Sequence, residues 1–311
     1  MTRARVGAVV SDCAPGLAFF LLLIIAPCTA RGQAAVAARD AGVAVGAQYD
    51  STHVYVVPGD LDAFVKSVIA TFGGQASKLS VTNVSPGPSS TEFQYVWTPV
   101  GTMSVFAFLT PIPFPFGAER TGYLVTDMDA AIREARAAGA EVYVEQFKDP
   151  IGLDAVIQFP GGVKMQLYWH PIAPKYAPLE TVPDNRVYVS RDAADKFVAS
   201  FVRFAHGKVL ADDARADAGE IGRAGESYRR IRITSVFGNM QVLVTDGHLP
   251  YPFGQEITGY EVRDLAATLE RAKGAGVKIL SAPYTTDDGR MSAIVEFPGG
   301  YIAEIHSVAV R

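Results

Sequence analysis

Two stretches of the chain carry nearly the same sequence: TGYLVTDMDAAIREARAAGA at 121–140 and TGYEVRDLAATLERAKGAGV at 258–277. They begin at Thr121 and Thr258, which are 137 positions apart. Each begins with a short β-branched and aromatic run and continues as an amphipathic segment; in the first copy Ile132 and Ala135 share the apolar face and Gly139 ends the run. This pattern predicts a strand followed by a helix, written twice.

The repeat extends beyond these two stretches. FPFG and YPFG precede them at the same distance, and FPGGVKMQL and FPGGYIAEI follow them with one residue inserted. Two further starts have the same strand and helix order, THVYVV before DLDAFVKSVIATFGG and NRVYVS before DAADKFVASFVRFA. Four βαβββ units in two pairs are the simplest description, which predicts an α+β fold. We expect domains at 47–170 and 184–311, joined by the proline-rich segment 171–183.

Length and composition agree with two packed domains. The chain has 311 residues, of which 49% are hydrophobic and 19% are charged, which is enough apolar material for sizeable cores. The net charge is −4 and the sequence contains no long basic run, so nucleic acid is not an expected partner.

The first residues differ from the rest. Arg3 and Arg5 precede the apolar run LAFFLLLIIA at 17–26, and small residues follow it. This pattern is typical of a secretory signal peptide, so we assign 1–34 to a signal and processing region and predict a periplasmic or secreted protein without a membrane span in its mature chain. A retained membrane anchor is one alternative. Another is lipid attachment through Cys28, because IIAPC resembles a bacterial lipobox apart from its proline.

The only two cysteines, Cys13 and Cys28, both lie in this first region. A chain cut after Ala30 would contain none, which excludes disulfides, thiolate nucleophiles and cysteine-bound zinc from the mature protein. Cleavage after Ala34 has the same consequence.

The repeated units resemble the vicinal oxygen chelate superfamily, which includes glyoxalase I, extradiol dioxygenases, fosfomycin-resistance proteins and bleomycin-binding proteins. The resemblance is carried by THVYVVPGDLDAF, by the two copies that begin at Thr121 and Thr258, and by DAVIQFPGGVKMQL and SAIVEFPGGYIAEI. It covers nearly the whole mature chain and implies two domains in which paired units form a cupped sheet. It also implies that metal ligands come from the first strand of each unit and from the last strand of the second unit.

Those positions are only partly filled by residues that bind metals. The corresponding residues are His53, Thr121 and Gln166 in the first pair, and Arg186, Thr258 and Glu304 in the second. An open catalytic metal site needs about three His or carboxylate ligands. We therefore expect an incomplete metal site, with a buried Arg186–Glu304 ion pair where a cation would otherwise lie.

Other residues have two interpretations. His53 is a metal ligand or an ordinary rim residue, and Glu304 is the best candidate for a catalytic carboxylate. Crossed pairing of units one and four would bring these two together, but short connections favour sequential pairing. Tyr123 and other strand aromatics either line a pocket or fill the core. The remaining histidines lack metal-ligand spacing and are expected at the surface or at sheet edges: His170, His206, His248 and His306.

The leading interpretation is an exported protein that binds a small molecule in a cupped sheet, with Gln166, Thr121, Thr258, Arg186 and Tyr123 as candidate ligand contacts. The alternative is a lyase or dioxygenase in which His53, with Glu304 or Gln166, holds a divalent metal. A third possibility is a scaffold with both cups filled and a partner protein on its surface. The cofactor is unknown beyond that metal, and a homodimer is possible.

Overall fold

The computed structural model of the chain describes residues 42–84, 87–117 and 121–308. The predicted signal peptide and both cysteines lie outside the described residues. Among the residues described, no helix is both long enough and apolar enough to cross a membrane.

The first half of the chain forms two successive units. The first unit contains β1 (Ser51–Tyr55), α2 (Leu61–Phe72), β2 (Gln75–Ala76), β3 (Ser80–Thr82), β4 (Thr91–Thr98) and β5 (Gly101–Phe108), after a short 3-10 turn, η1 (Ala47–Tyr49). The second contains β6 (Thr121–Leu124), α3 (Met128–Ala137), β7 (Glu141–Lys148), β8 (Leu153–Gln158) and β9 (Lys164–Trp169).

The second half repeats this order. The third unit contains β10 (Asp184–Val189), α4 (Arg191–Phe204), β11 (Lys208–Asp217), the 3-10 turn η2 (Ala218–Ile221), β12 (Ser227–Ser235) and β13 (Gly238–Val244). The fourth contains β14 (Ile257–Glu261), α5 (Leu265–Gly274), β15 (Lys278–Thr285), β16 (Arg290–Glu296) and β17 (Ile302–Val308).

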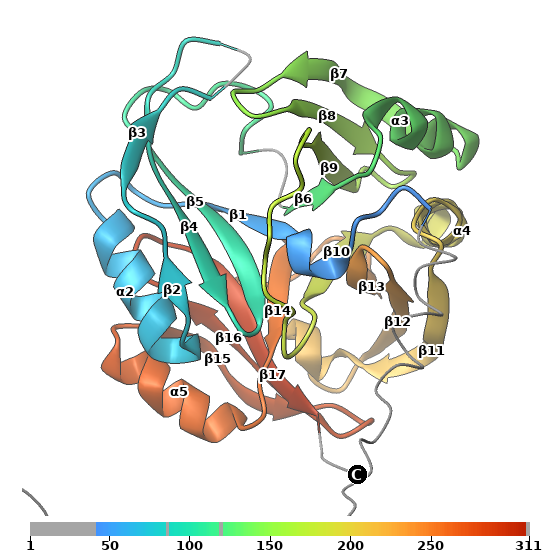
Figure 1. Cartoon of the computed structure of the whole chain (residues 1–311). Helices are drawn as coiled ribbons and strands as arrows, with labels where there is room; N and C mark the ends of the chain where they lie inside the picture. Colours follow the sequence, from blue (N-terminus) through green and yellow to red (C-terminus); the bar gives the residue numbers. More distant parts are fainter. Residues whose placement is uncertain (1–41, 85–86, 118–120, 309–311) are drawn as a thin grey trace, which may run out of the picture.

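Two curled mixed sheets result, and each joins two consecutive units (Figure 1). The strand order is β2-β4-β5-β1-β6-β9-β8-β7 in the first sheet, with β3 beside β4, and β11-β12-β13-β10-β14-β17-β16-β15 in the second. The units meet at their first strands, where Ser51 lies opposite Gly122 and Asp184 lies opposite Gly259. The expected α+β fold and sequential pairing are confirmed, so crossed pairing does not form either sheet.

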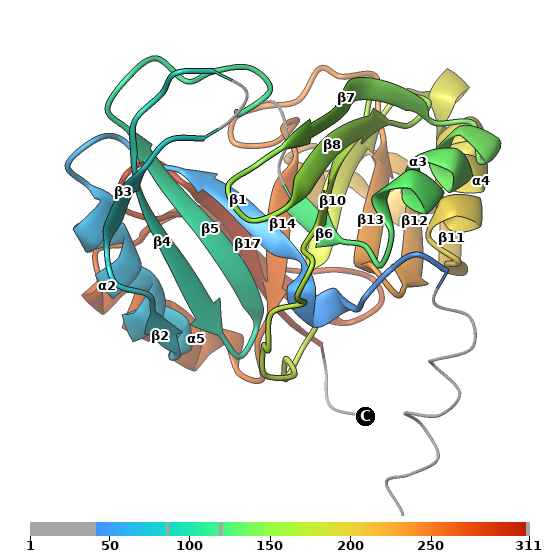
Figure 2. The same cartoon turned by 45° about the horizontal axis from the view of Figure 1, so that its top comes forward.

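Crossed contacts do occur on the helix-covered faces of the sheets. One core combines the second and third units, with the ring of Phe159, which follows β8, 5.5 Å from that of Phe201 in α4. The other combines the first and fourth units, with Phe64 of α2 5.9 Å from Phe297. Helix α2 accordingly lies beside α5 in both views (Figures 1 and 2). The two halves therefore share their hydrophobic cores, while each keeps its own concave face.

The duplicated helices begin by the same device. The Asp127 carboxylate accepts a hydrogen bond from the Ala130 amide at 2.7 Å, and Asp264 accepts one from Ala267 at 2.9 Å. Each bond satisfies one of the amides that a helix start leaves unpaired. Asp60, the residue expected to cap α2, makes no such side-chain bond.

Candidate functional site

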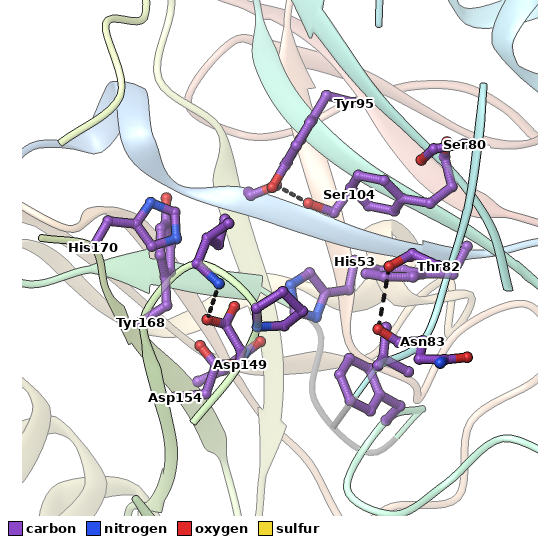
Figure 3. Close-up of a pocket in the computed structure, with 18 of the residues that line it drawn as sticks. His53, Ser80, Thr82, Asn83, Tyr95, Ser104, Asp149, Asp154, Tyr168 and His170 are labelled. Atoms are coloured by element: carbon purple, nitrogen blue, oxygen red, sulfur yellow. Dashed lines mark hydrogen bonds between the residues drawn. The ribbon is translucent and has the colours of Figure 1, made fainter. Parts of the chain in front are cut away.

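A cavity of about 300 Å³ lies on the concave face of the first sheet (Figure 3). Side chains alternate between the two faces of a strand, so Ser51 and His53 of β1 point into it while Thr52 and Val54 point away. Its lining comes from β1, β3, β4, β5, β8 and β9 and from four connecting segments. Most of these are aromatic or neutral polar residues: Ser51, His53, Ser80, Thr82, Asn83, Phe93, Tyr95, Ser104, Phe106, Phe116, Gln166, Tyr168, His170 and Tyr176.

His53 and Gln166 form the floor of this cavity, and both lie next to Gly122 of β6. A Cβ atom at Gly122 would lie 3.2 Å from His53 Nε2 and 3.4 Å from Gln166 Oε1, so the glycine leaves both polar atoms uncovered. Gln166 is only 7% exposed, and its Oε1 has no hydrogen-bond partner among the described residues. A buried polar atom without a partner is unfavourable, so this floor is suited to a ligand that donates a hydrogen bond.

One wall consists of aromatic rings from β4 and β5. The Phe106 ring lies edge-on to His53 at 5.6 Å between centroids, and Phe93 lies 5.1 Å from Phe106 and 4.7 Å from Tyr95. Ser104 lies beside this wall, with its hydroxyl 2.7 Å from that of Ser51. The wall therefore offers a large apolar surface with few hydrogen-bonding groups.

The opposite wall comes from β8, β9 and the segment between the sheets. Tyr168 donates its hydroxyl hydrogen to the Tyr49 carbonyl oxygen, and Tyr176 stacks on Tyr49 at 5.5 Å. Asp154 of β8 and His170 also belong to this wall. Burial lowers the pKa of His170, although nearby Asp149 opposes this shift, so the imidazole is mainly neutral at pH 7.

The concave face of the second sheet is filled by charged side chains. Arg186 and Glu304 are each 1% exposed, with Arg186 Nη1 3.2 Å from Glu304 Oε1. Arg290 Nη2 lies 2.9 Å from the other Glu304 oxygen, and Arg290 Nη1 lies 2.5 Å from Asp184. The predicted Arg186–Glu304 ion pair is thus present, and Arg290 extends it into a network.

These contacts control the charge of Glu304. Burial alone would raise its pKa, but Arg186 and Arg290 outweigh burial and lower it to about 2. His306 lies in the same network, where its Nδ1 is 3.0 Å from Arg290 Nη2. With an exposed fraction of 1%, His306 corrects the expectation that it would lie at the surface or at an edge. His248 and His206 do have exposed side chains.

A second group of charged side chains covers the part of this concave face nearer β11 and β12. Arg230 pairs with Glu220, and Tyr228 donates to the same carboxylate at 2.6 Å. Arg230 also reaches Asp287 at 2.8 Å. Long charged side chains thus occupy this face, although Arg186 Nε, Arg290 Nε and Gln241 Oε1 have no hydrogen-bond partner among the described residues.

The same fold positions carry different chemistry in the two sheets. In the strand register, Gly122 lies opposite Gln166 in the first sheet and Gly259 lies opposite Glu304 in the second, so Gln166 and Glu304 occupy equivalent positions. His53 lies opposite Ser104, and Arg186 lies opposite Gln241, so His53 is equivalent to Arg186 and Ser104 to Gln241. On the next strands, β4 and β12, the same register makes Phe93 equivalent to Arg230 and Tyr95 equivalent to Arg232. Smaller or aromatic residues thus line the first cavity where long charged residues fill the second face.

The register also shows which residues of β6 and β14 face the concave sides. These residues are Gly122, which lies against Gln166, and Gly259, which lies against Glu304. Thr121 and Thr258 were expected at these positions, but their side chains lie on the opposite faces, where both hydroxyls are 3.4 Å from Asn185 Oδ1. A shift of one residue moves a side chain to the other face of a strand, which explains the difference.

The candidate ligand contacts are consequently not gathered in one place. Gln166 faces the first cavity with His53, whereas Arg186 lies buried in the second sheet. Tyr123 packs in the core between the second and third units, and its hydroxyl accepts a hydrogen bond from Asn185 at 2.6 Å. A ligand role for Tyr123, Thr121 and Thr258 stays a prediction.

The side chains on the floor of the first-sheet cavity do not form a set of ligands that fits a catalytic metal. His53 is a good ligand, Gln166 offers only an amide, and Gly122 offers no side chain. Across the described residues, no group of three His, Cys, Asp or Glu side chains is placed to hold a metal ion. Glu304, the expected carboxylate ligand, lies in the other sheet with two arginines.

Several residues of the cavity were missed in the sequence. Tyr176 belongs to a proline-rich segment whose composition indicates only a linker, and Asp154 interrupts an otherwise apolar strand. His170 was expected at an edge, and it borders the cavity. The one sequence signal was an acid within an apolar strand, and the structure shows that Asp154 is only 6% exposed.

Comparison with known proteins supports the fold. No family model and no curated protein matches the chain. Among solved structures, a mutant of 4-hydroxymandelate synthase from Streptomyces coelicolor has a TM-score of 0.55 at 11% identity, covering 86% of this chain and 92% of that one. A fusion of a xylose isomerase-like barrel with 4-hydroxyphenylpyruvate dioxygenase has a TM-score of 0.50 at 11% identity, covering 87% of this chain and 50% of that one.

At this level of identity the likeness concerns the fold alone. The sequence resemblance, the two cupped sheets and these structural neighbours agree with one another. The chain therefore has the fold of these neighbours, with two cupped mixed sheets, as its sequence resemblance implied.

Proposed function

We propose that this protein binds a small molecule on the concave face of its first sheet. The observation that carries the proposal is the contrast between the two halves: the first face encloses a cavity of about 300 Å³, whereas the second is filled by the Arg186–Glu304–Arg290 network. A cavity of this size is at the lower end of the range found for small-molecule sites.

The lining supports binding of a ligand with an apolar body. Phe93, Phe106 and Tyr95 present rings along one wall, while the floor presents a few polar atoms from His53 and Gln166. Ligand sites commonly combine a largely apolar surface with a few polar groups that set orientation. The unpartnered Oε1 of Gln166 supplies such a group.

A metal-dependent lyase or dioxygenase is the alternative that the sequence resemblance implies, and the name of one fold neighbour includes a dioxygenase. The described residues give it little support, because only His53 on the cavity floor is a strong metal ligand. The metal content of the purified protein distinguishes the two functions, as set out in the Discussion.

We also propose that the protein is exported, since residues 1–34 have the pattern of a signal peptide. Cell fractionation and N-terminal sequencing of the mature chain test this proposal. Retention in the membrane that is lost on Cys28→Ser would indicate lipid attachment instead.

The binding function can be tested by closing the cavity. Ser104→Gln places in the cavity lining the residue type found at the equivalent position of the filled second face, where Gln241 is buried. The control is Ser227→Gln, the same change at an exposed position of β12. We expect indole and 2-phenylethanol to bind the natural protein and the control, as detected by ligand-observed NMR, and to lose binding in Ser104→Gln. Equal binding in all three proteins would overturn the proposal.

A further inference from the structure

The side chain of Gln166 carries a buried hydrogen-bond acceptor. Gln166 is 7% exposed and lines the first cavity, and its Oε1 has no hydrogen-bond partner within the described part of the chain. Gly122, which lies beside it, has no side chain that could cover this oxygen. A buried acceptor of this kind costs free energy until a donor reaches it, so it favours a ligand that brings one.

The second sheet shows how the chain satisfies the equivalent position. Glu304 is equivalent to Gln166, and its Oε2 accepts a hydrogen bond from Arg290 Nη2 at 2.9 Å. The guanidinium group of Arg290 is flat and carries its N–H donors on its edge. At this position of the second sheet, a planar N–H group therefore supplies the donor.

The first sheet has no side chain at the position of Arg290. In its register, Gly152 lies four residues before the residue opposite Gln166. Arg290 lies four residues before the residue opposite Glu304, so Gly152 and Arg290 are equivalent. A Cβ atom at Gly152 would overlap the carbonyl oxygen of Trp169, so a larger residue does not fit there unless the backbone moves. The donor that Arg290 brings to Glu304 is thus left to a bound molecule at Gln166.

The walls of the cavity favour a flat molecule. The rings of Phe106 and Tyr95 belong to one wall, and the ring of Tyr168 belongs to the opposite wall. A flat apolar body packs well against such rings, while a polar group on its edge can reach the floor.

From these observations we propose that the ligand is a flat ring system with an N–H donor on its edge, as in a lactam or a cyclic urea, and that Gln166 selects it by accepting this hydrogen bond. The inference rests on the proposed binding function and specifies the class of ligand. The ring body would lie against Phe106, and the N–H would take the place that the Arg290 guanidinium takes in the second sheet.

Three probes with the same bicyclic skeleton test the inference. The compound 2-oxindole has an N–H in its ring, 2-indanone has a CH₂ group at that place, and 2-indanol has an O–H outside the ring plane. Titrations followed by NMR on the protein would give the three affinities. We expect 2-oxindole to bind about tenfold or more tightly than 2-indanone, which corresponds to about 1.4 kcal/mol, and 2-indanol to lie between them.

A variant assigns the selectivity to Gln166. Gln166→Met removes the acceptor and keeps a side chain of similar length, so its affinities for 2-oxindole and 2-indanone should differ by less than about threefold. Gln146→Met, the same change at an exposed position of β7, should keep the preference of the natural protein.

Thermal unfolding of Gln166→Met gives a second readout. Because Oε1 has no partner among the described residues, its removal should not lower the melting temperature. A marked decrease relative to Gln146→Met would show that the amide is held by the structure, and would overturn the inference.

The binding outcomes separate this inference from the binding function. Equal affinities for 2-oxindole and 2-indanone would overturn the inference and leave the binding function standing. A preference for 2-oxindole that persists in Gln166→Met would overturn it as well, and 2-indanol bound as tightly as 2-oxindole would overturn the assignment to an N–H donor. Binding of none of the three probes would also overturn the inference, while the experiment with indole, 2-phenylethanol and Ser104→Gln would decide the binding function.

Discussion

Arg186 in β10 occupies the position that His53 occupies in β1. Each pairs with the strand on one side through equivalent residues, Ser104 and Gln241. On the other side, the equivalent glycines Gly122 and Gly259 lie opposite Ser51 and Asp184. The long guanidinium group reaches Glu304 and fills its concave face, whereas the shorter imidazole leaves a cavity. The difference in side-chain length and charge at this one position accounts for much of the contrast between the two halves.

The ion network of the second sheet should be essential for stability. Glu304→Gln leaves Arg186 and Arg290 buried without their shared negative charge, so we expect a loss of about 3 to 5 kcal/mol in the free energy of unfolding. Urea denaturation measures it. The control is Glu270→Gln, which breaks an exposed pair with Lys273 and should cost less than about 1 kcal/mol. Similar losses in both variants would show that the network is not exceptional.

The same carboxylate predicts a dependence of stability on pH. The pKa of Glu304 is about 2 in the folded protein and has an ordinary value of 4.5. Between these values the unfolded chain binds more protons, so stability is fully present above pH 4.5 and falls as the pH decreases toward 2. The loss from this group is on the order of 3 kcal/mol. Unfolding measured at pH 5 and pH 3 should show a smaller decrease in Glu304→Gln than in the natural protein; an equal decrease would contradict this origin.

The two equivalent glycines should respond differently to the same substitution. A Cβ at Gly259 would lie 2.5 Å from Glu304 Oε2, whereas one at Gly122 would lie 3.2 Å from its nearest neighbour, His53 Nε2. We expect Gly259→Ala to destabilise the protein by about 1 to 3 kcal/mol through overpacking, and Gly122→Ala to have a smaller effect. Thermal unfolding of the two variants compares them directly, and a larger effect at Gly122 would be inconsistent with the filled second face.

The metal content of the natural protein should be low. Among the described residues, none on the cavity floor gives His53 a second strong metal ligand. We therefore expect well below one equivalent of divalent metal by elemental mass spectrometry, with no change in His53→Ala. One equivalent in the natural protein that is absent in His53→Ala would instead support the metal-dependent enzyme.

A metal site should be obtainable by restoring the missing ligands. Gly122→His combined with Gln166→Glu would add an imidazole and a carboxylate next to His53, giving three ligands of the type that divalent metals prefer. Cobalt(II) titration followed by visible absorption should then reveal a site. Thr121→His with the same Gln166→Glu is the matched control, since Thr121 faces the other side of β6, and it should bind no cobalt. Equal binding by the two double variants would show that the assignment of faces is wrong.

Much of the architecture could be predicted from local and repeated features of the sequence. The copies that begin at Thr121 and Thr258 have the same strand and helix periodicity and the same capping aspartates, Asp127 and Asp264. Short connections between consecutive units favoured sequential pairing, which both sheets show. The Arg186–Glu304 pair could also be anticipated, because a buried arginine needs a carboxylate and the resemblance placed both residues in the same cup.

The sequence by itself therefore determined the four units, their fold and the ion pair of the second half. Only the tertiary structure decided which side chains line the open cavity. Because strand side chains alternate, a one-residue difference in register exchanged Thr121 for Gly122 on the concave face. The approach of Tyr176 and Asp154 to Gln166 depends on how the curled sheet and the segment between the sheets close around one space, and no local pattern encodes such long-range contacts.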